Sequence, residues 1–497
     1  MVAATRQAQA AWAALPLAQR LAVLRRFRGA LSKQALPLAQ ASATARGRSL
    51  AEVLTAEVLP LADACRFLER HATRTLRPRR LGRRGRPLWL SGVQSEIRRE
   101  PLGVVLVIGP GNYPLFLPAV QCLQALAAGN AVLLKPAPTG AAAARAWIAL
   151  LAEAGLPSGL CVLLEEDPRQ ARQAIEAGVD KVVLTGSATT GQAVLNQLAP
   201  RLTPATLELS GMDAAVICAD ADLKLAAGAL VFGLSLNAGA TCIAPRRLFV
   251  DAQVAEPFRE ALREAARHRP STDAPLKSPR ELVDALTTEL ARTPPWIGTG
   301  NVGGLRTPLI CEVPGDSPLW QQEWFAGIAL VARVRDEAEA VQRAQASPYA
   351  LGASVFSRDT AAARRLAAQL PAGVVTINDL IVPTADPRLP FGGRGRSGFG
   401  VTRGLEGLVE MTVPKVVSLR RGRWRPHYEP ETAGAAELFA SYLRLAHGRG
   451  IRERWRAGCD LVRRAWQAAR AAGKSSARPP DGEPGNSTGG VRPPRTP

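Results

Sequence analysis

The chain has 497 residues, of which 47% are hydrophobic and 21% are charged. This length and composition indicate a globular protein of two or three domains, because a single core rarely grows to that size. The chain has no uninterrupted run of 18 apolar residues, which argues against a membrane span. The seven cysteines are odd in number and form no Cys-x-x-Cys pair. Neither a disulfide framework nor a metal site is therefore predicted, and a reducing, cytoplasmic location is favoured.

The net charge of +21 raises the question of a nucleic-acid or anionic-membrane partner. Only seven of the 63 basic residues are lysine, a bias typical of codon composition rather than of phosphate contacts. Residues 420–497 hold 16 basic and 7 acidic residues, so much of the excess belongs to the C-terminal part. Since no nucleic-acid-binding motif accompanies the charge, no nucleic-acid partner is predicted.

Helices are expected within residues 1–75. The first 51 residues lack Asp and Glu, a feature shared with Arg-rich transit peptides. Leucines at helical spacing nevertheless favour an ordinary helix that packs on a core. They are Leu17, Leu21, Leu24 and Leu31. The basic, Pro/Gly-rich segment 77–99 that follows is predicted to form an exposed β-arm.

From residue 104 to residue 377, short buried strands alternate with helices, the pattern of right-handed βαβ units in parallel sheets. The first set of predicted strands is 104–108, 131–134, 161–164 and 181–186, with helices over 114–129, 140–154 and 168–177. The second set is 214–218, 246–250, 328–334, 353–356 and 373–377, with helices over 336–347 and 359–370. The predicted fold class is therefore α/β, with two α/β domains.

Residues 425–474 differ from the rest, because apolar residues at helical spacing with Arg-rich outer faces predict amphipathic helices here. The apolar residues are Leu438, Tyr442, Leu445, Trp455, Cys459, Val462 and Trp466. Two interpretations stay open: a helical hairpin that packs on the body, or a surface for a membrane or another protein. Residues 475–497 are rich in Pro, Gly and Ser and are predicted to be disordered.

Two polar residues follow predicted strands at the sheet edge where α/β proteins bind ligands. Asn112 belongs to the turn "GPGNYP" directly after strand 104–108. Its amide either points off that edge or satisfies local backbone groups. Lys135 directly follows strand 131–134, where its ammonium can reach a phosphate or a ribose hydroxyl. Because lysine is scarce in this chain, a binding role is favoured over that of a solvated side chain.

A third strand end carries the stretch "TGSATTGQ", residues 185–192. Gly186 and Gly191 flank a strand-to-helix turn there, and let the backbone and the helix N-terminus approach a pyrophosphate. The spacing is not that of the GxGxxG fingerprint, so the stretch alone is weak evidence for a dinucleotide.

Glu208 and Cys242, 34 residues apart, are the candidate base and nucleophile. Glu208 lies among apolar residues, where desolvation favours the neutral carboxyl and moves its pKa toward the working range of a general base. Cys242 lies in the small-residue run "NAGATCIAP", residues 237–245. A thiolate attacks aldehyde carbonyls readily, and Asn112 together with the Cys242 N–H can hold the resulting oxyanion. The alternative for Cys242 is a buried structural cysteine.

In this order and spacing, the motifs resemble those of the aldehyde dehydrogenase superfamily over residues 10–420, most closely its class 3-like branch with a short N-terminus. The matching residues are Asn112, Lys135, Ser187, Glu208 and Cys242. Further along, "QEWFAG" resembles the family motif that places Glu323 on the nicotinamide ribose and Phe325 beside the ring. The resemblance therefore adds Ser187, Glu323 and Phe325 to the expected cofactor-binding residues.

The resemblance implies a two-domain fold with a Rossmann-like cofactor domain, an α/β catalytic domain, a β-arm for oligomerisation and a C-terminal helical tail. The expected parts are 1–209 for cofactor binding, 210–385 for catalysis, 386–424 for the return to the cofactor domain with an oligomerisation strand, and the extension 425–474. It also implies NAD or NADP as cofactor, a homodimer, and oxidation of an apolar or aromatic aldehyde to a carboxylic acid. Cys242 would carry the acyl group as a thioester, and Glu208 would activate the hydrolytic water.

The chain departs from the family pattern at several positions. The family's aromatic residue, Gly and Gln are replaced by Gly111, Ser210 and Ala240. Pro138 replaces a Glu that bonds the adenosine ribose, which removes repulsion against a 2′-phosphate and predicts that NADP is tolerated. Two alternative functions stay open: an acylating or semialdehyde dehydrogenase on the same fold, and a catalytically weak scaffold that acts through its basic C-terminal helices. Glu208 favours hydrolysis over acyl transfer to coenzyme A.

Overall fold

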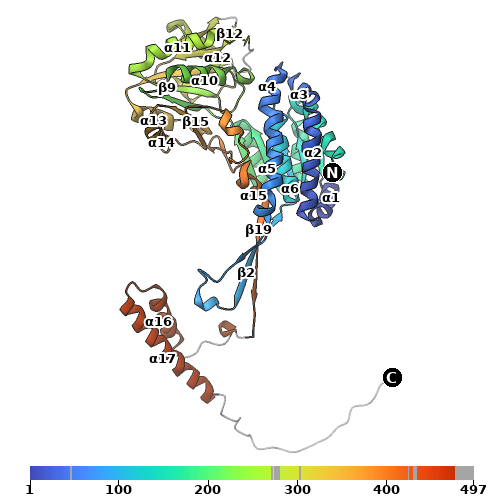
Figure 1. Cartoon of the computed structure of the whole chain (residues 1–497), viewed down its shortest axis with the longest axis vertical. Helices are drawn as coiled ribbons and strands as arrows, with labels where there is room; N and C mark the ends of the chain where they lie inside the picture. Colours follow the sequence, from blue (N-terminus) through green and yellow to red (C-terminus); the bar gives the residue numbers. More distant parts are fainter. Residues whose placement is uncertain are drawn as a thin grey trace, which may run out of the picture. The chain divides into compact units, whose positions relative to one another are not determined.

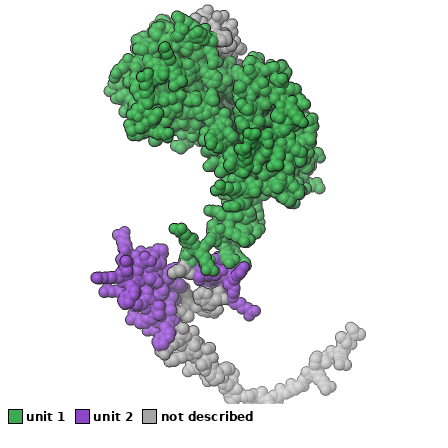
Figure 2. Space-filling view, viewed as in Figure 1, with its two compact units in different colours: residues 1–88, 94–419 green, residues 89–93, 420–497 purple. Residues whose placement is uncertain are grey.

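The structure, a computed structural model, describes residues 1–44, 47–269, 272–273, 280–301, 304–423, 425–428 and 434–475. The chain forms two compact units (Figure 2). The first holds residues 1–88 and 94–419, and the second holds residues 89–93 and the chain from residue 420 onward. From residue 476 on, the tail predicted to be disordered lies outside the described residues.

The N-terminal part of the first unit is helical, as predicted (Figure 1). Its elements are α1 (Val2–Ala14), α2 (Leu17–Lys33), α3 (Ala35–Ala43), α4 (Leu50–Val53), a π-helical turn (Leu54–Val58) and α5 (Leu59–Leu76). Leu21, Leu24 and Leu31 of α2 are buried, which confirms the helix packed on a core. These helices share a hydrophobic core with helix α6 (Phe116–Ala128), whose residues are all buried.

The first sheet has the strand order β18-β7-β6-β3-β4-β5. Its strands are β3 (Val104–Ile108), β4 (Ala131–Lys135), β5 (Cys161–Leu163), β6 (Lys181–Gly186), β7 (Ala205–Leu209) and β18 (Gly398–Phe399). All neighbours are parallel except β18, which pairs antiparallel with β7. The helices of this part, besides α6, are α7 (Ala141–Glu153), α8 (Pro168–Glu176) and α9 (Ala188–Leu198). The sequence analysis did not predict β7, because Glu208 interrupts its apolar run.

The second sheet has the strand order β10-β12-β13-β9-β8-β15-β16, and β11 pairs with β12. Its strands are β8 (Asp213–Ile217), β9 (Pro245–Asp251), β10 (Thr272–Asp273), β11 (Ile297–Asn301), β12 (Gly304–Glu312), β13 (Ile328–Val334), β15 (Gly352–Phe356) and β16 (Val374–Ile377). The helices are α10 (Leu223–Ser235), α11 (Ala255–Arg267), α12 (Arg280–Arg292), α13 (Glu337–Gln345) and α14 (Thr360–Ala367). Two short strands, β14 (Tyr349–Ala350) and β17 (Arg394–Gly395), pair with each other, and α15 (Gly404–Glu410) follows β18.

A third sheet, with the strand order β1-β2-β19, joins two segments far apart in the sequence. Its strands are β1 (Arg79–Leu81), β2 (Val93–Pro101) and β19 (Thr412–Arg420). Ser95 and Ser418 share a 2.9 Å hydrogen bond, and Lys415 pairs with Glu100 at 2.9 Å. In the second unit, α16 (Ala435–His447) packs against α17 (Ile451–Ser475). None of the described helices is both long enough and apolar enough to cross a bilayer.

Glu57 in the π-helical turn joins the N-terminal helices to the first sheet. Its carboxylate is fully buried, and it pairs with Arg48 Nη1 at 2.6 Å and accepts a hydrogen bond from Ser42 Oγ at 2.8 Å. It also accepts hydrogen bonds from the backbone N–H groups of Leu115 (2.8 Å) and Phe116 (3.1 Å), at the N-terminus of α6. A buried carboxylate is stable only with such partners, so α6 and Glu57 depend on each other.

The substitution Glu57→Ala is expected to lower the free energy of unfolding by about 3–5 kcal/mol, because it leaves two helix N–H groups without an acceptor and the buried Arg48 guanidinium with Glu52 as its remaining carboxylate partner. Denaturant titration followed by circular dichroism measures the change. Glu260→Ala serves as the control, since Glu260 is exposed and pairs only with Arg263 one turn away. Equal destabilisation by both substitutions would contradict the role given to Glu57.

Candidate active site

Cys242 lies in a loop of unusual backbone conformation, residues 237–244, which we call the cysteine loop. Asn237 and Ala238 have φ angles of 52° and 53°, in the left-handed region that such residues seldom adopt. Gly239 also has a positive φ, and a Cβ on it would lie 2.1 Å from the backbone nitrogen of Gly327. Strained backbone of this kind persists only where its surroundings hold it.

The buried guanidinium of Arg246, at the start of β9, holds the cysteine loop. Its Nε donates a 2.7 Å hydrogen bond to the carbonyl of Trp324, and its Nη2 donates a 2.9 Å bond to that of Thr241. Longer bonds, of 3.2–3.5 Å, reach the carbonyls of Gly239, Ala244 and Cys242. One planar side chain thereby fixes the backbone on both sides of the thiol.

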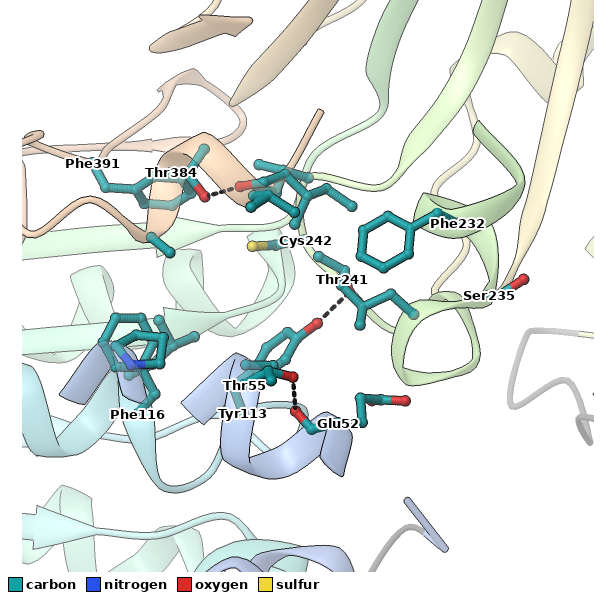
Figure 3. A pocket seen from close by; sticks show the side chains of 18 of the residues that line it. Glu52, Thr55, Tyr113, Phe116, Phe232, Ser235, Thr241, Cys242, Thr384 and Phe391 are labelled. Atoms are coloured by element: carbon teal, nitrogen blue, oxygen red, sulfur yellow. Dashed lines mark hydrogen bonds between the residues drawn. The ribbon is translucent and has the colours of Figure 1, made fainter. Parts of the chain in front are cut away.

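A cavity of about 510 Å³ lies in front of the thiol, and the Cys242 sulfur faces it (Figure 3). Most of the wall is apolar and comes from Phe116, Leu117, Phe232, Leu236, Ile243, Ile381, Val382 and Phe391. The charged residues of the wall are Glu52, Arg269 and Arg403. The hydroxyl groups of Tyr113 and Thr241, also in the wall, share a 2.6 Å hydrogen bond. An apolar molecule therefore fits this cavity better than a highly charged one.

The resting thiol is protonated at neutral pH. Burial, followed by the carboxylates of Glu208 and Asp213, raises the pKa of Cys242 to about 12. The guanidinium groups of Arg246 and Arg403 oppose this rise and favour the thiolate. Cys242 nevertheless keeps part of its surface open to the cavity, so a small electrophile can reach the sulfur.

Glu208 lies in β7 and is buried. One carboxylate oxygen accepts hydrogen bonds from Thr185 Oγ1 (3.1 Å) and Gln121 Nε2 (3.2 Å), and the other accepts one from Thr402 Oγ1. Burial raises the pKa of Glu208, while the charge of Arg403 and these donors act to lower it. The neutral form is favoured more than in an exposed glutamate, which agrees with the sequence-based expectation.

The positive charge of Arg403 acts on both candidate catalytic groups, Glu208 and Cys242, and Arg403 has a φ of 58°. Its Nη1 donates a 2.6 Å hydrogen bond to the carbonyl of Thr384, and its guanidinium stacks over the ring of Phe391 at 4.3 Å. Its buried Nε makes no hydrogen bond within the described part of the chain. Burial lowers the pKa of Arg403, and the charges of Glu208 and Cys242 oppose that shift.

Asn112 follows β3, and its side chain lies against the cysteine loop. Its Nδ2 donates a 3.1 Å hydrogen bond to the carbonyl of Ala240, two residues before the thiol. The backbone carbonyl of Asn112 accepts a 2.9 Å hydrogen bond from Asn237 Nδ2. Among the described residues, the backbone N–H of Cys242 donates to no acceptor. The amide of Asn112 and the N–H of Cys242 thus reach the same loop, although Asn112 lies outside the cavity wall.

Three of the predicted cofactor residues lie at the carboxyl ends of β4 and β6: Lys135, Gly186 and Ser187. Burial lowers the pKa of Lys135, and the charges of Glu166 and Asp167 act against this. Its ammonium makes no hydrogen bond or ion pair with the residues that the structure describes. Ser187 caps α9, since its Oγ accepts a 3.2 Å hydrogen bond from the N–H of Thr190. The N-terminus of α9 and the ammonium of Lys135, at the same edge of the sheet, each suit a phosphate group.

The remaining predicted residues differ in their surroundings. A Cβ on Gly191 would lie 2.8 Å from a methyl carbon of Leu209, so α9 packs closely on β7, whereas Gly186 ends β6 without such crowding. Glu323 accepts a 3.2 Å hydrogen bond from the hydroxyl of Tyr349. Phe325 is 40% exposed, and the guanidinium of Arg246 lies 5.5 Å from its ring centre. Phe325 is thereby linked to the cysteine loop, whereas Lys135 lies outside the cavity wall.

Sequence reasoning missed the residues that position these groups. Arg246 carried a signal, because it is a charge inside a predicted buried strand. The hydrogen-bond donors to Glu208 and the two buried ionic residues near the cavity gave none, since each depends on contacts between distant segments. They are Gln121, Thr402, Arg403 and Glu57. Thr185 belongs to the turn at residues 185–192 that the sequence singled out, but its bond to Glu208 was not predicted.

The aldehyde dehydrogenase family model matches residues 1–417, so the chain belongs to the aldehyde dehydrogenase family. It is 32% identical to a 4,4'-diapolycopene aldehyde oxidase of Methylomonas, over 89% of this chain and 86% of that protein. It is 29% identical to betaine aldehyde dehydrogenase 1 of Rhizobium meliloti, over 85% of this chain and 89% of that one.

Among solved structures, an NADP-dependent glyceraldehyde-3-phosphate dehydrogenase from Bacillus halodurans in complex with NADP is similar, with a TM-score of 0.78 and 28% identity. The match covers 84% of this chain and 90% of that one. The predicted family, its enzymatic class and the α/β fold are therefore confirmed. The class 3-like branch stays a prediction.

The charges around Cys242 predict opposite effects of two substitutions on its alkylation by iodoacetamide at fixed alkaline pH. Glu208→Gln removes a carboxylate that raises the pKa of the thiol, and is expected to speed alkylation several-fold. Arg403→Met removes a guanidinium that lowers it, and is expected to slow alkylation several-fold, because one pKa unit changes the thiolate fraction about tenfold. Mass spectrometry of the Cys242 peptide separates it from the exposed Cys459. Changes of the same sign in both variants would refute this account.

Proposed function

We propose that this protein oxidises an apolar aldehyde to a carboxylic acid, with NAD or NADP as hydride acceptor. The observation that carries the proposal is the Cys242 thiol at the wall of an apolar cavity, with a buried carboxylate and an amide against its loop. The assignments of Cys242, Glu208 and Asn112 as catalytic residues are part of this proposal.

The cofactor-binding residues would be Lys135, Gly186, Ser187, Gly191, Glu323 and Phe325. The unpaired ammonium of Lys135, the N-terminus of α9 and the exposed ring of Phe325 fit the phosphates and the flat ring of a nicotinamide dinucleotide. When bound, the dinucleotide supplies the hydride acceptor that aldehyde oxidation requires.

In this mechanism the Sγ of Cys242 attacks the carbonyl carbon of the aldehyde. The proton of the thiol must leave first, and Arg246 and Arg403 lower the cost of that loss. The oxygen of the resulting tetrahedral adduct gains negative charge, for which the free N–H of Cys242 and the second hydrogen of the Asn112 amide are suitable donors.

After oxidation the acyl group is bound to Sγ of Cys242 as a thioester, and water must hydrolyse it. Glu208 would take a proton from that water as a general base. Gln121 and Thr185 donate to one of its oxygens and Thr402 alone to the other, so the oxygen next to Thr402 keeps an acceptor position for the water. Because burial raises its pKa, the hydrolytic step should have an acid limb above the ordinary range of a glutamate.

The apolar wall of the cavity supports the substrate class. A semialdehyde is the second candidate, because Arg403 and Arg269 could meet a distal carboxylate and the Nε of Arg403 has no partner. Glu52 in the same wall would repel that carboxylate. Identification of the products formed from a panel of aldehydes separates this function from an acylating reaction with coenzyme A and from a catalytically weak scaffold.

We extend the proposal to a homodimer formed through the third sheet. Strand β19 lies at the edge of that sheet and exposes Val416 and Leu419. An exposed apolar edge strand commonly pairs with a second chain.

A panel of aldehydes with NAD or NADP tests the function, read as absorbance of the reduced cofactor and as the free acid formed. Medium-chain and aromatic aldehydes are expected to give kcat/KM values at least about tenfold above that of succinate semialdehyde, because only the former match the apolar wall. Cys242→Ser should abolish turnover. Cys459→Ser, at an exposed thiol in the second unit, should retain it. Cofactor binding without turnover of any aldehyde would favour the scaffold. Cofactor reduction that requires coenzyme A and yields acyl-coenzyme A in place of the free acid would favour acyl transfer.

The cofactor preference gives a separate prediction. Because Pro138 has no carboxylate to repel a 2′-phosphate, the KM values for NAD and NADP are expected to lie within about tenfold of each other. Steady-state kinetics at saturating aldehyde measure both. Pro138→Glu is expected to raise the KM for NADP and leave that for NAD nearly unchanged. A strong preference of the wild type for NAD would refute the prediction.

A further inference from the structure

Helix α17 carries an apolar stripe that its partner helix does not cover. Ile451, Trp455, Val462 and Trp466 fall within about 60° of one another around the helix axis, at 3.6 residues per turn. They are 88%, 70%, 70% and 56% exposed. Four large apolar side chains in line, all exposed, are unusual on the surface of a soluble protein.

The stripe is separate from the face that holds the hairpin together. Within residues 451–467 of α17 the buried residue is Ala457, and a Cβ on the neighbouring Gly458 would lie 3.4 Å from a methyl carbon of Leu445 on α16. Arg454 Nε also donates a 2.9 Å hydrogen bond to the carbonyl of Leu445. Helix α16 lies along α17 (Figure 1), and this packing uses one face of α17 while the exposed stripe occupies another.

Arginines flank the stripe. Arg452, Arg456 and Arg463 lie within about 40° of one another and directly beside the apolar residues around the helix axis. Arg452 and Arg456 are exposed, and neither forms an ion pair among the described residues. Residues 435–467 contain seven arginines and three acidic residues, so the hairpin is strongly basic.

We infer that α17 docks on an anionic lipid bilayer, with the apolar stripe in the headgroup region and the flanking arginines on the lipid phosphates. Tryptophan prefers this boundary because its ring is apolar and its N–H is polar. A helix with aromatic residues beside a basic row is the common design of interfacial helices. The helix lies on the membrane and does not cross it, in agreement with its charge and with the finding on spanning helices.

The positive charge of the hairpin favours an anionic bilayer over a second copy of the hairpin as the partner of the stripe. A second copy of the hairpin would bring two basic rows together, which disfavours self-association through α17. The stripe runs over about 22 Å of helix, a length that suits a broad surface. The inference is independent of the proposed reaction, because it uses no residue of the active site.

Co-sedimentation of the full chain with vesicles tests the inference. Binding is expected to vesicles of phosphatidylglycerol and phosphatidylcholine, to be much weaker with phosphatidylcholine alone, and to fall as salt is raised. The double variant Trp455→Ala/Val462→Ala should weaken binding about tenfold or more, as should Arg452→Gln/Arg456→Gln. Circular dichroism and the unfolding midpoint establish that each variant is folded.

Matched controls lie in the first unit. Leu202→Ala removes an apolar side chain that is also highly exposed, and Arg364→Gln/Arg365→Gln removes two exposed charges from α14. Both controls should bind as the wild type does. The inference is overturned if the chain does not bind anionic vesicles, or if the α17 variants bind as the wild type does. It is also overturned if light scattering without lipid shows self-association that depends on α17.

Discussion

The geometry of the candidate active site depends on one buried cation, Arg246. The backbone before Cys242 is left-handed at two successive residues that are not glycine, a conformation that the chain would leave if nothing held it. The guanidinium binds carbonyls on both sides of the thiol and also the carbonyl of Trp324, so the strain is offset by bonds that a lysine could not make in the same geometry. Phe325, beside the same guanidinium, shares this support.

The charge of Arg246 also affects the pKa of the Cys242 thiol. A thiol whose pKa is raised to about 12 is protected from oxidation and alkylation at rest, but it is a poor nucleophile. Arg246 and Arg403 favour the thiolate, whereas Glu208 and Asp213 oppose it. Protonation of Glu208 would remove one of the charges that raise the pKa of Cys242 and would move this balance toward the thiolate.

The parts of the fold that sequence reasoning predicted are those set by local pattern. The apolar runs around Val104 and Val331 are buried strands with few polar residues, and their periodicity needs no tertiary contact to be recognised. Strand β7 could not be recognised in this way, because its apolar run contains Glu208. The fold tolerates that buried carboxylate only through donors from three distant segments. Glu57 and Arg403 were missed for the same reason: their roles come from partners that the fold assembles, and no spacing in the sequence encodes them.

The scarcity of lysine has a structural counterpart. A codon bias accounts for how many arginines the chain has, but not for which of them are buried. Arg48, Arg246 and Arg403 each place a planar guanidinium where it meets a carboxylate, several carbonyls or an aromatic ring, contacts for which a compact ammonium has the wrong shape. Lys135 is in the opposite situation, since its ammonium at the end of β4 has no hydrogen-bond or ion-pair partner among the residues that the structure describes, and burial lowers its pKa. At Lys135 a lysine thus leaves a cation available to a ligand, whereas these buried arginines, like Lys181 with its ion pair to Glu410, hold the protein's own groups.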